Sequence, residues 1–281
     1  MSERAEAVPA SKPAKPVEGK RAERRSLKTG VNNVAVGAAI PVITLVLWQL
    51  FCETGDIDPF FFPSPLAIGA AFGELAETGE LFRHIGVSLG RVLAGFGIGG
   101  TLGWIFGLLA GFSRRTEMML DPMIQLLRLT PSLALAPLFI LWFGFGETSK
   151  VLIIATSAYF PLYVNTVLGI RNVDNKLVEV SRALEYNTAG LIRKLILPSS
   201  LPSILLGVRL SLAVSWLSVV VAEMINSKSG IGYLIYFGQY NSRTELIFVG
   251  VIIFAVAGKL VDSLVRYLER QLLGWRDSFR G

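Results

Sequence analysis

Long runs of apolar residues alternate with short polar segments along most of this chain. A helix that crosses the hydrocarbon core of a membrane needs about 20 predominantly apolar residues. Six segments reach or nearly reach this length, and they are approximately residues 34–52, 85–111, 122–143, 149–170, 203–226 and 245–266. The pattern therefore predicts an all-α integral membrane protein with about six transmembrane helices.

The composition agrees with this class and excludes several functions. Charged residues make up 17% of the 281 positions, whereas soluble domains carry about 25%. The formal net charge is +6, but the basic residues cluster between spans and at the two ends, which argues against a nucleic-acid partner. A single cysteine, Cys52, and a single histidine, His84, argue against a disulfide framework and against a metal site built from these residue types. The sequence also lacks a phosphate-binding loop.

The distribution of Lys and Arg predicts the orientation of the spans. With the N-terminus in the cytosol, the inside segments are 1–33, 112–121, 171–202 and 266–281. These inside segments hold 19 Lys and Arg residues. The outside segments hold only Arg83, Lys150, Lys228 and Arg243. The asymmetry predicts cytoplasmic termini and makes 171–202 the longest cytosolic loop between spans.

Three parts are expected along the chain. Residues 1–33 are polar, contain eight Lys and Arg, and are interpreted as a disordered basic cytosolic tail. Residues 34–275 form the transmembrane domain, and residues 276–281 form a cytosolic C-terminal end. Between the first two spans, Pro65 is expected near the start of a short helix, because proline is favoured in a first helical turn.

Glycines recur every fourth residue in the second predicted span. They are Gly95, Gly99, Gly103, Gly107 and Gly111. Small residues at this spacing allow two helix backbones to approach closely. The repeat predicts a tightly packed helix, either within the chain or against a second copy.

Prolines and charged residues inside the spans are candidates for a translocation path. Pro131 and Pro161 free backbone carbonyls that neighbouring helices or cavity water must satisfy. Arg128 and Arg209 lie toward the cytosolic ends of their spans, where they either snorkel to the headgroups or face a cavity for an anionic solute. Glu223 lies near the outer end of the fifth span, and a structural pair with a basic residue is expected there.

One charged pair is expected within the last span. Lys259 and Asp262 are three residues apart, so on a helix they would lie on the same face and neutralise each other. Nothing in the sequence resembles a proton relay, which would need several buried carboxylates or histidines.

The cytosolic loop 171–202 has amphipathic character. Apolar residues recur at helical spacing from Leu177 to Leu184 and again from Leu191 to Leu197, with turn-forming residues between them. This pattern predicts two short helices joined by a turn. Such a pair either docks a partner protein or lies on the lipid headgroups.

The same loop resembles the EAA loop of bacterial ABC-importer permeases. That loop has the pattern Glu-Ala-Ala, a Gly six residues after the Glu, and Leu-Pro near its end. Glu179 takes the Glu place, and Leu197 and Pro198 take the Leu-Pro place. Val180 and Ser181 stand where the alanines would be.

The loop departs from that pattern at Glu185, which occupies the expected Gly position. We expect the turn to move to Asn187 or Gly190, because both tolerate a positive φ. The resemblance implies a set of ATPase-coupling residues, namely Glu179, Ser181, Ala183, Leu184, Glu185, Asn187, Gly190, Leu197 and Pro198.

The resemblance extends over roughly residues 35–275. The stretches FPSPLAI, SLGRVLAGFGIGG, LAPLFILWFGFGETSK, YVNTVLGIRNVD and SGIGYLI resemble the nitrate/sulfonate/taurine/bicarbonate permease family. The third and fourth of these stretches look closest to the aliphatic-sulfonate branch. This resemblance implies the transmembrane domain of a type I ABC importer, located in the bacterial inner membrane.

In such an importer two permease copies form the pore, and two cytosolic ATPase subunits bind their loops. A periplasmic binding protein delivers the solute from outside. The short helix around 180–192 would be the coupling helix. The resemblance implies that ATP and Mg belong to the ATPase subunits, so this chain would bind no cofactor and would not be an enzyme on its own.

The cargo implied by the resemblance is a small anion, with aliphatic sulfonates as the first choice. The alternatives are the same machinery for taurine, nitrate, bicarbonate, an aromatic acid or a pyrimidine precursor. From a different class, a stand-alone secondary transporter would need paired acidic residues at the membrane midplane or an internal repeat, and the sequence has neither. A membrane enzyme is disfavoured by the single histidine and the single cysteine.

Overall fold

The computed structural model of the protein describes residues 39–54, 58, 60–129, 131–225 and 227–273, without the side chains of Arg128 and Leu133. The chain divides into two units, residues 1–57 and residues 58–281, which are described separately. The first unit contributes an apolar helix, Ala39–Glu53, that covers most of the expected span 34–52. The expected basic tail 1–33 and the C-terminal end 276–281 lie outside the described residues.

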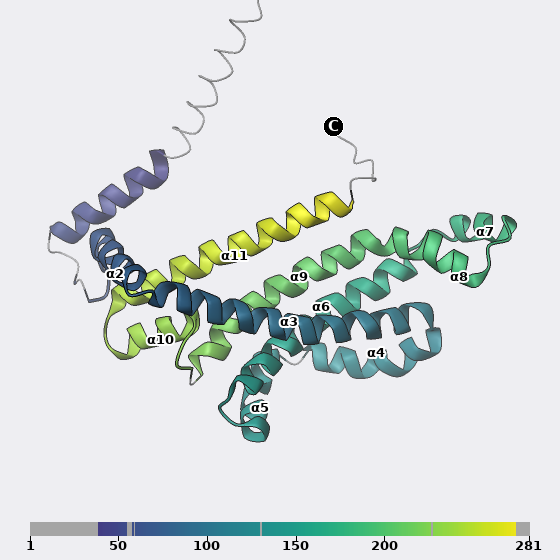
Figure 1. Ribbon diagram of the computed structural model, residues 1–281, viewed down its shortest axis with the longest axis horizontal. Helices are drawn as coiled ribbons and strands as arrows, with labels where there is room; N and C mark the ends of the chain where they lie inside the picture. The colour runs from purple at the N-terminus through teal and green to yellow at the C-terminus, as the bar shows by residue number, and fades with distance from the viewer. Residues whose placement is uncertain (1–38, 55–57, 59, 130, 226, 274–281) are drawn as a thin grey trace, which may run out of the picture. The chain divides into compact units, whose positions relative to one another are not determined.

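The second unit is helical throughout its described elements (Figure 1). Four of its helices are long and apolar enough to cross a membrane. They are α3 (Glu80–Phe112), α6 (Glu147–Arg171), the helical stretch Thr188–Met224 that ends in α9 (Leu197–Met224), and α11 (Thr244–Leu272). These helices confirm the predicted spans 85–111, 149–170, 203–226 and 245–266.

Shorter helices connect the long ones. They are α2 (Pro65–Glu77), α4 (Arg114–Leu129), the 3₁₀ turn η1 (Ser132–Leu135), α5 (Ala136–Phe143), α7 (Asn175–Ala183), α8 (Thr188–Leu191), the π-helical turn η2 (Ile192–Ile196) and α10 (Ile231–Tyr240). The helix expected at Pro65 is confirmed, and the Ser64 hydroxyl caps it by accepting a hydrogen bond from the Ala67 N–H at 3.2 Å. The sequence pattern did not predict α10.

The prediction of one continuous span over 122–143 was wrong. The structure ends α4 at Leu129, inserts η1 after Pro131, and restarts as α5. Pro131 has no N–H to donate to an α-helical ladder and its ring clashes with the preceding turn, so proline kinks or breaks a helix. Helix α6 continues through Pro161, whereas the helix breaks at Pro131. Pro137 is accepted in α5 because it lies in the first turn, where its missing N–H costs nothing.

Helices α3 and α6 pack closely along the glycine repeat. A Cβ atom at Gly99 would overlap the carbonyl oxygen of Ala155, and one at Gly103 would overlap that of Tyr159. The other members of the repeat, Gly95, Gly107 and Gly111, also face α6. The glycine repeat therefore packs against α6 of the same chain.

Helix α6 also packs against α9 on its other side. A Cβ atom at Gly207 would crowd Leu162 and Asn165 of α6, so these backbones are close as well. The Ser211 hydroxyl of α9 donates a hydrogen bond to the Ala158 carbonyl of α6. Helix α6 is thus the central helix of the unit, and it holds α3 and α9 in fixed positions.

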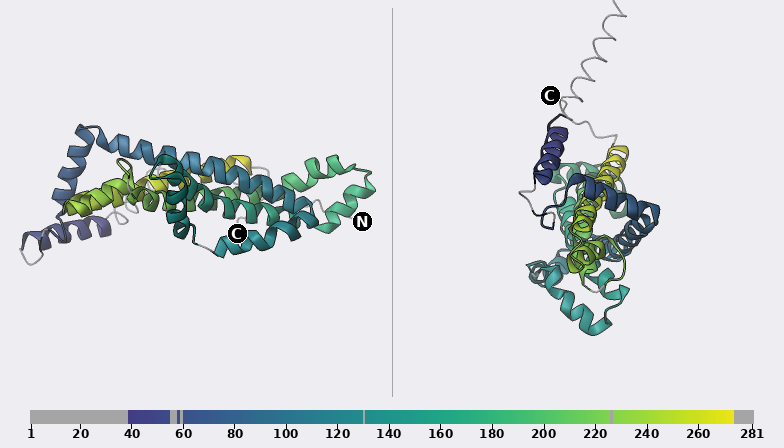
Figure 2. Two further views of the ribbon diagram at one scale, coloured as in Figure 1. Left: turned by 90° about the horizontal axis from the view of Figure 1, so that it is seen from below. Right: turned by 90° about the vertical axis from the view of Figure 1, so that its left-hand side faces the viewer.

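Two pairs of the shorter helices lie at opposite ends of this unit (Figures 1 and 2). The pair α7 and α8 projects at one end, whereas α2 and α10 lie at the other. At the α2 end, Arg243 bonds Glu245 and also Glu74 of α2. Hydrogen bonding to Glu245, followed by Glu74, raises the pKa of Arg243, so the guanidinium stays charged in this clasp.

Candidate translocation path and coupling hairpin

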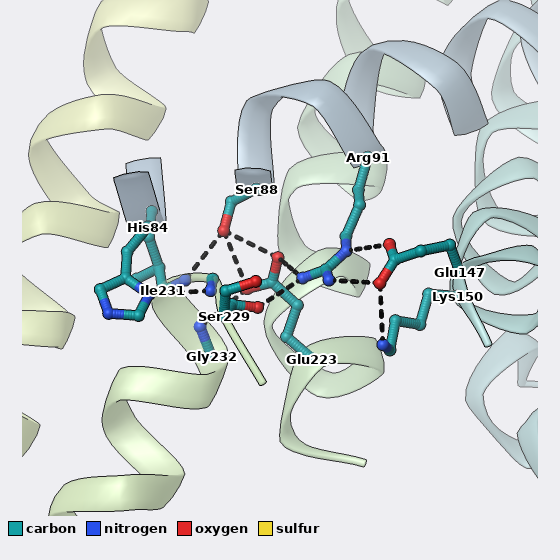
Figure 3. Close-up of polar contacts among 10 residues, drawn as sticks. His84, Ser88, Arg91, Glu147, Lys150, Glu223, Ser229, Ile231 and Gly232 are labelled. Atoms are coloured by element: carbon teal, nitrogen blue, oxygen red, sulfur yellow. Dashed lines mark hydrogen bonds and ion pairs between the residues drawn. The ribbon is translucent and has the colours of Figure 1, made fainter. Parts of the chain in front are cut away.

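A cluster of charged side chains joins four helices near the end that carries α10 (Figure 3). At its centre is Arg91 of α3, whose side chain is only 5% exposed. Its Nε and one terminal nitrogen bond both carboxylate oxygens of Glu147 at 2.6 Å. The other terminal nitrogen bonds Glu223 at 2.8 Å and the Ser229 carbonyl at 2.7 Å. One guanidinium therefore ties α3 to α6, to α9 and to the segment before α10.

Glu223 of α9 is fully buried and fully supplied with donors. Besides Arg91, it accepts from the Ser88 hydroxyl at 2.8 Å and from the Gly232 N–H at 2.9 Å. Gly230 has a φ of 122°, and a Cβ atom there would overlap the Glu223 carboxylate. The turn before α10 can therefore close over this carboxylate only with glycine at that position.

The cluster is electrically balanced. Lys150 bonds Glu147 at 3.1 Å, so two cationic side chains face two carboxylates. A buried charge is tolerated only when it is paired and its remaining hydrogen-bonding capacity is filled. The basic partner expected for Glu223 is Arg91. The position of Glu223 indicates a helix-joining role, because both of its carboxylate oxygens already accept hydrogen bonds from the protein.

A pocket of about 420 Å³ lies between η1, α6 and α9, and we call it the polar pocket after the serine and asparagine side chains in its otherwise apolar lining. Its lining residues are Pro131, Ser132, Ser157, Phe160, Pro161, Val164, Asn165, Leu210 and Val214. The described residues leave one side of the pocket open. Pro131 and Pro161, both predicted to line a path, border this pocket.

The hydroxyls of Ser132 and Ser157 and the amide of Asn165 give the pocket its polarity, and Ser218 lies behind Ser157. The Ser218 hydroxyl donates to the Ser157 hydroxyl at 2.7 Å, and the Ser157 hydroxyl donates to that of Ser132 at 2.7 Å. On the same side of α6, the Asn165 amide donates to the Pro161 carbonyl at 2.8 Å. No ionisable side chain is among the described lining residues.

Arg209 lies away from these lining residues and is paired. Its Nε bonds Asp262 of α11 at 3.0 Å, and Arg266 bonds the other oxygen of Asp262 at 2.6 Å. The expected pair between Lys259 and Asp262 is therefore wrong, because Asp262 is occupied by the two arginines. Arg128 lies on α4, and its side chain falls outside the described part of the chain.

Residues 171–202 form the expected helical hairpin, in which α7 ends at a tight turn. The Tyr186 N–H bonds the Ser181 carbonyl at 3.1 Å, and the Glu185 N–H bonds the Arg182 carbonyl at 2.9 Å. Together with a φ of 57° at Glu185, these two bonds define a Schellman motif, in which the left-handed position is most often glycine. The proposed shift of the turn to Asn187 or Gly190 was wrong, because Glu185 itself adopts the positive φ.

The second arm of the hairpin starts with a capped turn. The Asn187 side chain accepts from the Gly190 N–H at 2.7 Å and so caps α8. The chain then makes one π-helical turn before Pro198, which lacks the N–H for a regular α-helical bond. The Lys194 ammonium lies 5.0 Å from the centre of the Tyr186 ring, and this cation–π contact links the second arm of the hairpin to the turn.

The hairpin exposes one apolar stripe. Leu177, Val180 and Leu184 follow one another at helical spacing, and their exposed fractions are 48%, 56% and 63%. Among the other residues implied by the EAA resemblance, Ser181 is buried, whereas Glu179 and Ala183 are exposed. Leu197 and Pro198 lie at the start of α9.

Five residues of these sites were not predicted from the sequence, namely Arg91, Ser88, Glu147, Ser132 and Ser157. Arg91 carried a usable signal, because it is a charged residue in the first half of an otherwise apolar span. The serines carried none, since small hydroxyl residues are common in membrane helices and only the fold shows which of them meet.

The family described as binding-protein-dependent transport system inner membrane component matches residues 99–274. The chain belongs to this family. It is therefore a multi-pass inner-membrane protein, and it is the permease of an ABC importer rather than its ATPase. An ATPase and a substrate-binding protein are implied as partners.

Two relatives carry the same name. The protein named aliphatic sulfonates transport permease SsuC from Bacillus subtilis is 51% identical over 245 residues, which cover 87% of this chain and 89% of the relative. The protein of the same name from Escherichia coli is 43% identical and covers 85% of this chain and 91% of the relative.

The permease fold also occurs among solved structures. A chain in the crystal structure of an amino acid ABC transporter with histidines aligns with a TM-score of 0.60 at 20% identity. The alignment covers 71% of this chain and 97% of that chain. This similarity supports the type I importer fold expected from the sequence and carries no information on cargo.

Proposed function

We propose that this chain is one half of a homodimeric permease that imports aliphatic sulfonates from the periplasm into the cytoplasm. Two cytosolic ATPase subunits drive it through the hairpin 171–202, and a periplasmic protein delivers the solute. The N- and C-termini are cytoplasmic. The observation that carries the cargo assignment is the 51% identity to a protein named for aliphatic sulfonates over 87% of this chain.

The polar pocket supports the proposed dimer. The lining includes Ser132, Ser157 and Asn165, yet the part of the chain that the structure describes leaves the pocket open on one side. Polar groups facing lipid tails would be costly, because hydrocarbon offers them no hydrogen-bonding partner. A second copy that covers the open side would remove this cost and complete a pore from two equivalent half-channels.

The hairpin supplies the contact with the ATPase. Leu177, Val180 and Leu184 form an exposed apolar stripe at the end of the unit opposite to α10. An amphipathic helix that leaves its apolar face uncovered is suited to a groove on a partner protein. The excess of Lys and Arg in the inside segments supports a cytosolic position for this hairpin.

Reconstituted uptake tests the cargo. Proteoliposomes would contain this permease, its ATPase and its binding protein, and would be offered an alkanesulfonate, taurine, nitrate, bicarbonate, an aromatic acid or a pyrimidine precursor. We expect ATP-dependent uptake and the largest stimulation of ATP hydrolysis with the alkanesulfonate. Stimulation by a neutral pyrimidine precursor alone would contradict an anion importer, and uptake without any ATPase would support a stand-alone transporter.

A pair of hairpin variants tests the coupling. Val180→Glu places a carboxylate on the apolar stripe, whereas Arg182→Glu places one on the opposite face of the same helix. We expect Val180→Glu to abolish ATPase binding and uptake while the protein remains in the membrane, and Arg182→Glu to retain both. If the hairpin lies on the headgroups instead, Val180→Glu would leave ATPase co-purification unchanged.

A further inference from the structure

The polar pocket between η1, α6 and α9 has a donor arrangement that the transport assignment does not explain. Ser218, Ser157 and Ser132 come from three different elements, and their hydroxyl oxygens follow one another at 2.7 Å. Ser157 and Ser218 are buried, whereas Ser132 is half-buried at the pocket wall. The chain of hydroxyls therefore runs from the protein interior toward the pocket.

The single proton of Ser157 has two acceptors within reach, and its position decides the direction of this chain. Each serine hydroxyl has one proton to donate and two lone pairs to accept with. When Ser218 donates to Ser157 and Ser157 donates to Ser132, the proton of Ser132 remains available for a group in the pocket. Ser157 has a second acceptor, the Ile153 carbonyl at 3.1 Å, and the shorter contact is the one to Ser132.

Asn165 supplies a second donor on the same helix as Ser157. One of its two amide protons is used by the Pro161 carbonyl at 2.8 Å, and the other has no acceptor among the described hydrogen bonds. Asn165 lines the same pocket as Ser132. The pocket therefore offers two uncharged donors, and Phe160, Val164 and Leu210 supply an apolar wall beside them.

This donor set fits a strongly acidic monoanion with a short carbon chain. A sulfonate group is fully ionised, presents three acceptor oxygens and has no proton to donate. Uncharged donors can hold it, and they avoid the tight ion pair that an arginine would form. Conduction also requires that a solute bind weakly enough to leave.

We propose that Ser132 and Asn165, with Ser157 and Ser218 behind Ser132, form a transient subsite for the sulfonate group of an alkanesulfonate on its way through the pore. The apolar wall takes the carbon chain. The inference rests on the proposed function, since it assumes that the pocket belongs to the path of a sulfonate importer. Ser157 and Ser218 act through Ser132 and are positioning residues.

Uptake by single variants tests the subsite. We expect Ser132→Ala and Ser157→Ala each to lower the maximal rate of methanesulfonate uptake by about tenfold, the loss typical of one hydrogen bond to a charged group. The apparent KM should change little, because the binding protein sets the affinity for free solute. ATP hydrolysis stimulated by the loaded binding protein should persist, so that fewer sulfonates enter per ATP.

Ser215→Ala is the matched control. Ser215 lies on α9 like Ser218 and is equally buried, but its hydroxyl bonds the Ser211 carbonyl of its own helix, and it is not among the lining residues. We expect wild-type uptake from this variant. The subsite is overturned if Ser132→Ala and Ser157→Ala take up methanesulfonate as fast as Ser215→Ala and the wild type do. In that case the proposed function stands.

Asn165→Asp provides a second measurement with almost unchanged side-chain volume. The added negative charge should stop methanesulfonate uptake while binding-protein-stimulated ATP hydrolysis continues. Undiminished uptake would overturn the subsite. If the wild type moves no sulfonate under any condition, the proposed function fails, and the subsite fails with it.

Discussion

Arg91 and Glu223 form an ion pair of 2.8 Å in which the side chains are 5% and 0% exposed. They come from α3 and α9, which are separated by 132 positions in the sequence. The same guanidinium also bonds Glu147 of α6. Three long helices are therefore joined at one end by a single side chain.

Removing one partner of this pair is expected to destabilise the fold strongly. Glu223→Gln leaves Arg91 buried with one less counter-charge, and breaking a buried ion pair typically costs about 3–5 kcal/mol. Thermal unfolding of the purified protein in detergent measures the effect. Glu74→Gln is the control, because the pair between Glu74 and Arg243 is exposed and such pairs contribute roughly 0–1 kcal/mol.

Replacing both Arg91 and Glu223 distinguishes the contribution of their charges from that of the side-chain volume of Arg91. An Arg91→Met, Glu223→Gln double variant removes the uncompensated charge, so it should be more stable than Glu223→Gln alone. Equal or greater destabilisation in the double variant would show that the side-chain volume of Arg91, rather than its charge, maintains this end of the unit.

The contact between α3 and α6 leads to a second prediction. A methyl group at Gly99 would overlap the Ala155 carbonyl, so Gly99→Ala must push the two helices apart, at a cost of about 1–3 kcal/mol. Gly97 lies two residues earlier on the same helix and has open space around it. Gly97→Ala should be neutral or stabilising by up to about 1 kcal/mol, because alanine favours helix. Thermal unfolding of both variants would refute the prediction if the two lost stability equally.

Sequence reasoning predicted the features that depend on local pattern. The glycine spacing indicated a closely packed helix, and the hydropathy of α3, α6, α9 and α11 located four spans. It did not find the break at Pro131, because the apolar run continues across it and hydropathy counts residues without regard to missing N–H groups. Arg91 was passed over because its partners, Glu147 and Glu223, are distant in sequence and only the fold brings them together.

The turn at Glu185 shows a different limit. The EAA resemblance marks this position as glycine, and the backbone there is left-handed, so the turn kept its place and accepted an unfavourable side chain. The backbone hydrogen bonds around a turn decide whether the turn shifts along the chain or keeps a non-glycine residue at a positive φ. Here the Tyr186 and Glu185 N–H groups already have their carbonyl partners, and moving the turn would break both bonds.

This strain leads to a third prediction. Glu185→Gly should stabilise the hairpin by about 1 kcal/mol, because glycine adopts a positive φ without the penalty of a Cβ atom. Slower hydrogen exchange at the Glu185 and Tyr186 amides would report the gain. Ala189→Gly is the control in the same hairpin, since its φ is not positive, and it should be destabilising. Faster exchange in Glu185→Gly than in the wild type would contradict the assignment.

Arg209 pairs with Asp262, and variants of both residues test whether Arg209 joins two helices or guides an anion. The pair links α9 to α11 at 3.0 Å, so we expect Arg209→Gln and Asp262→Asn to lower stability by similar amounts. The double variant should lose less than the sum, with a coupling energy of about 0.5–3 kcal/mol. Arg266→Gln is the control, because its bond to Asp262 lies within one helix and is worth about 0.2–0.5 kcal/mol.

If Arg209 instead guides an anion, Arg209→Gln would slow sulfonate uptake with no matching loss in Asp262→Asn. Parallel losses in uptake and in thermal stability for both variants are the result that a helix-joining role requires.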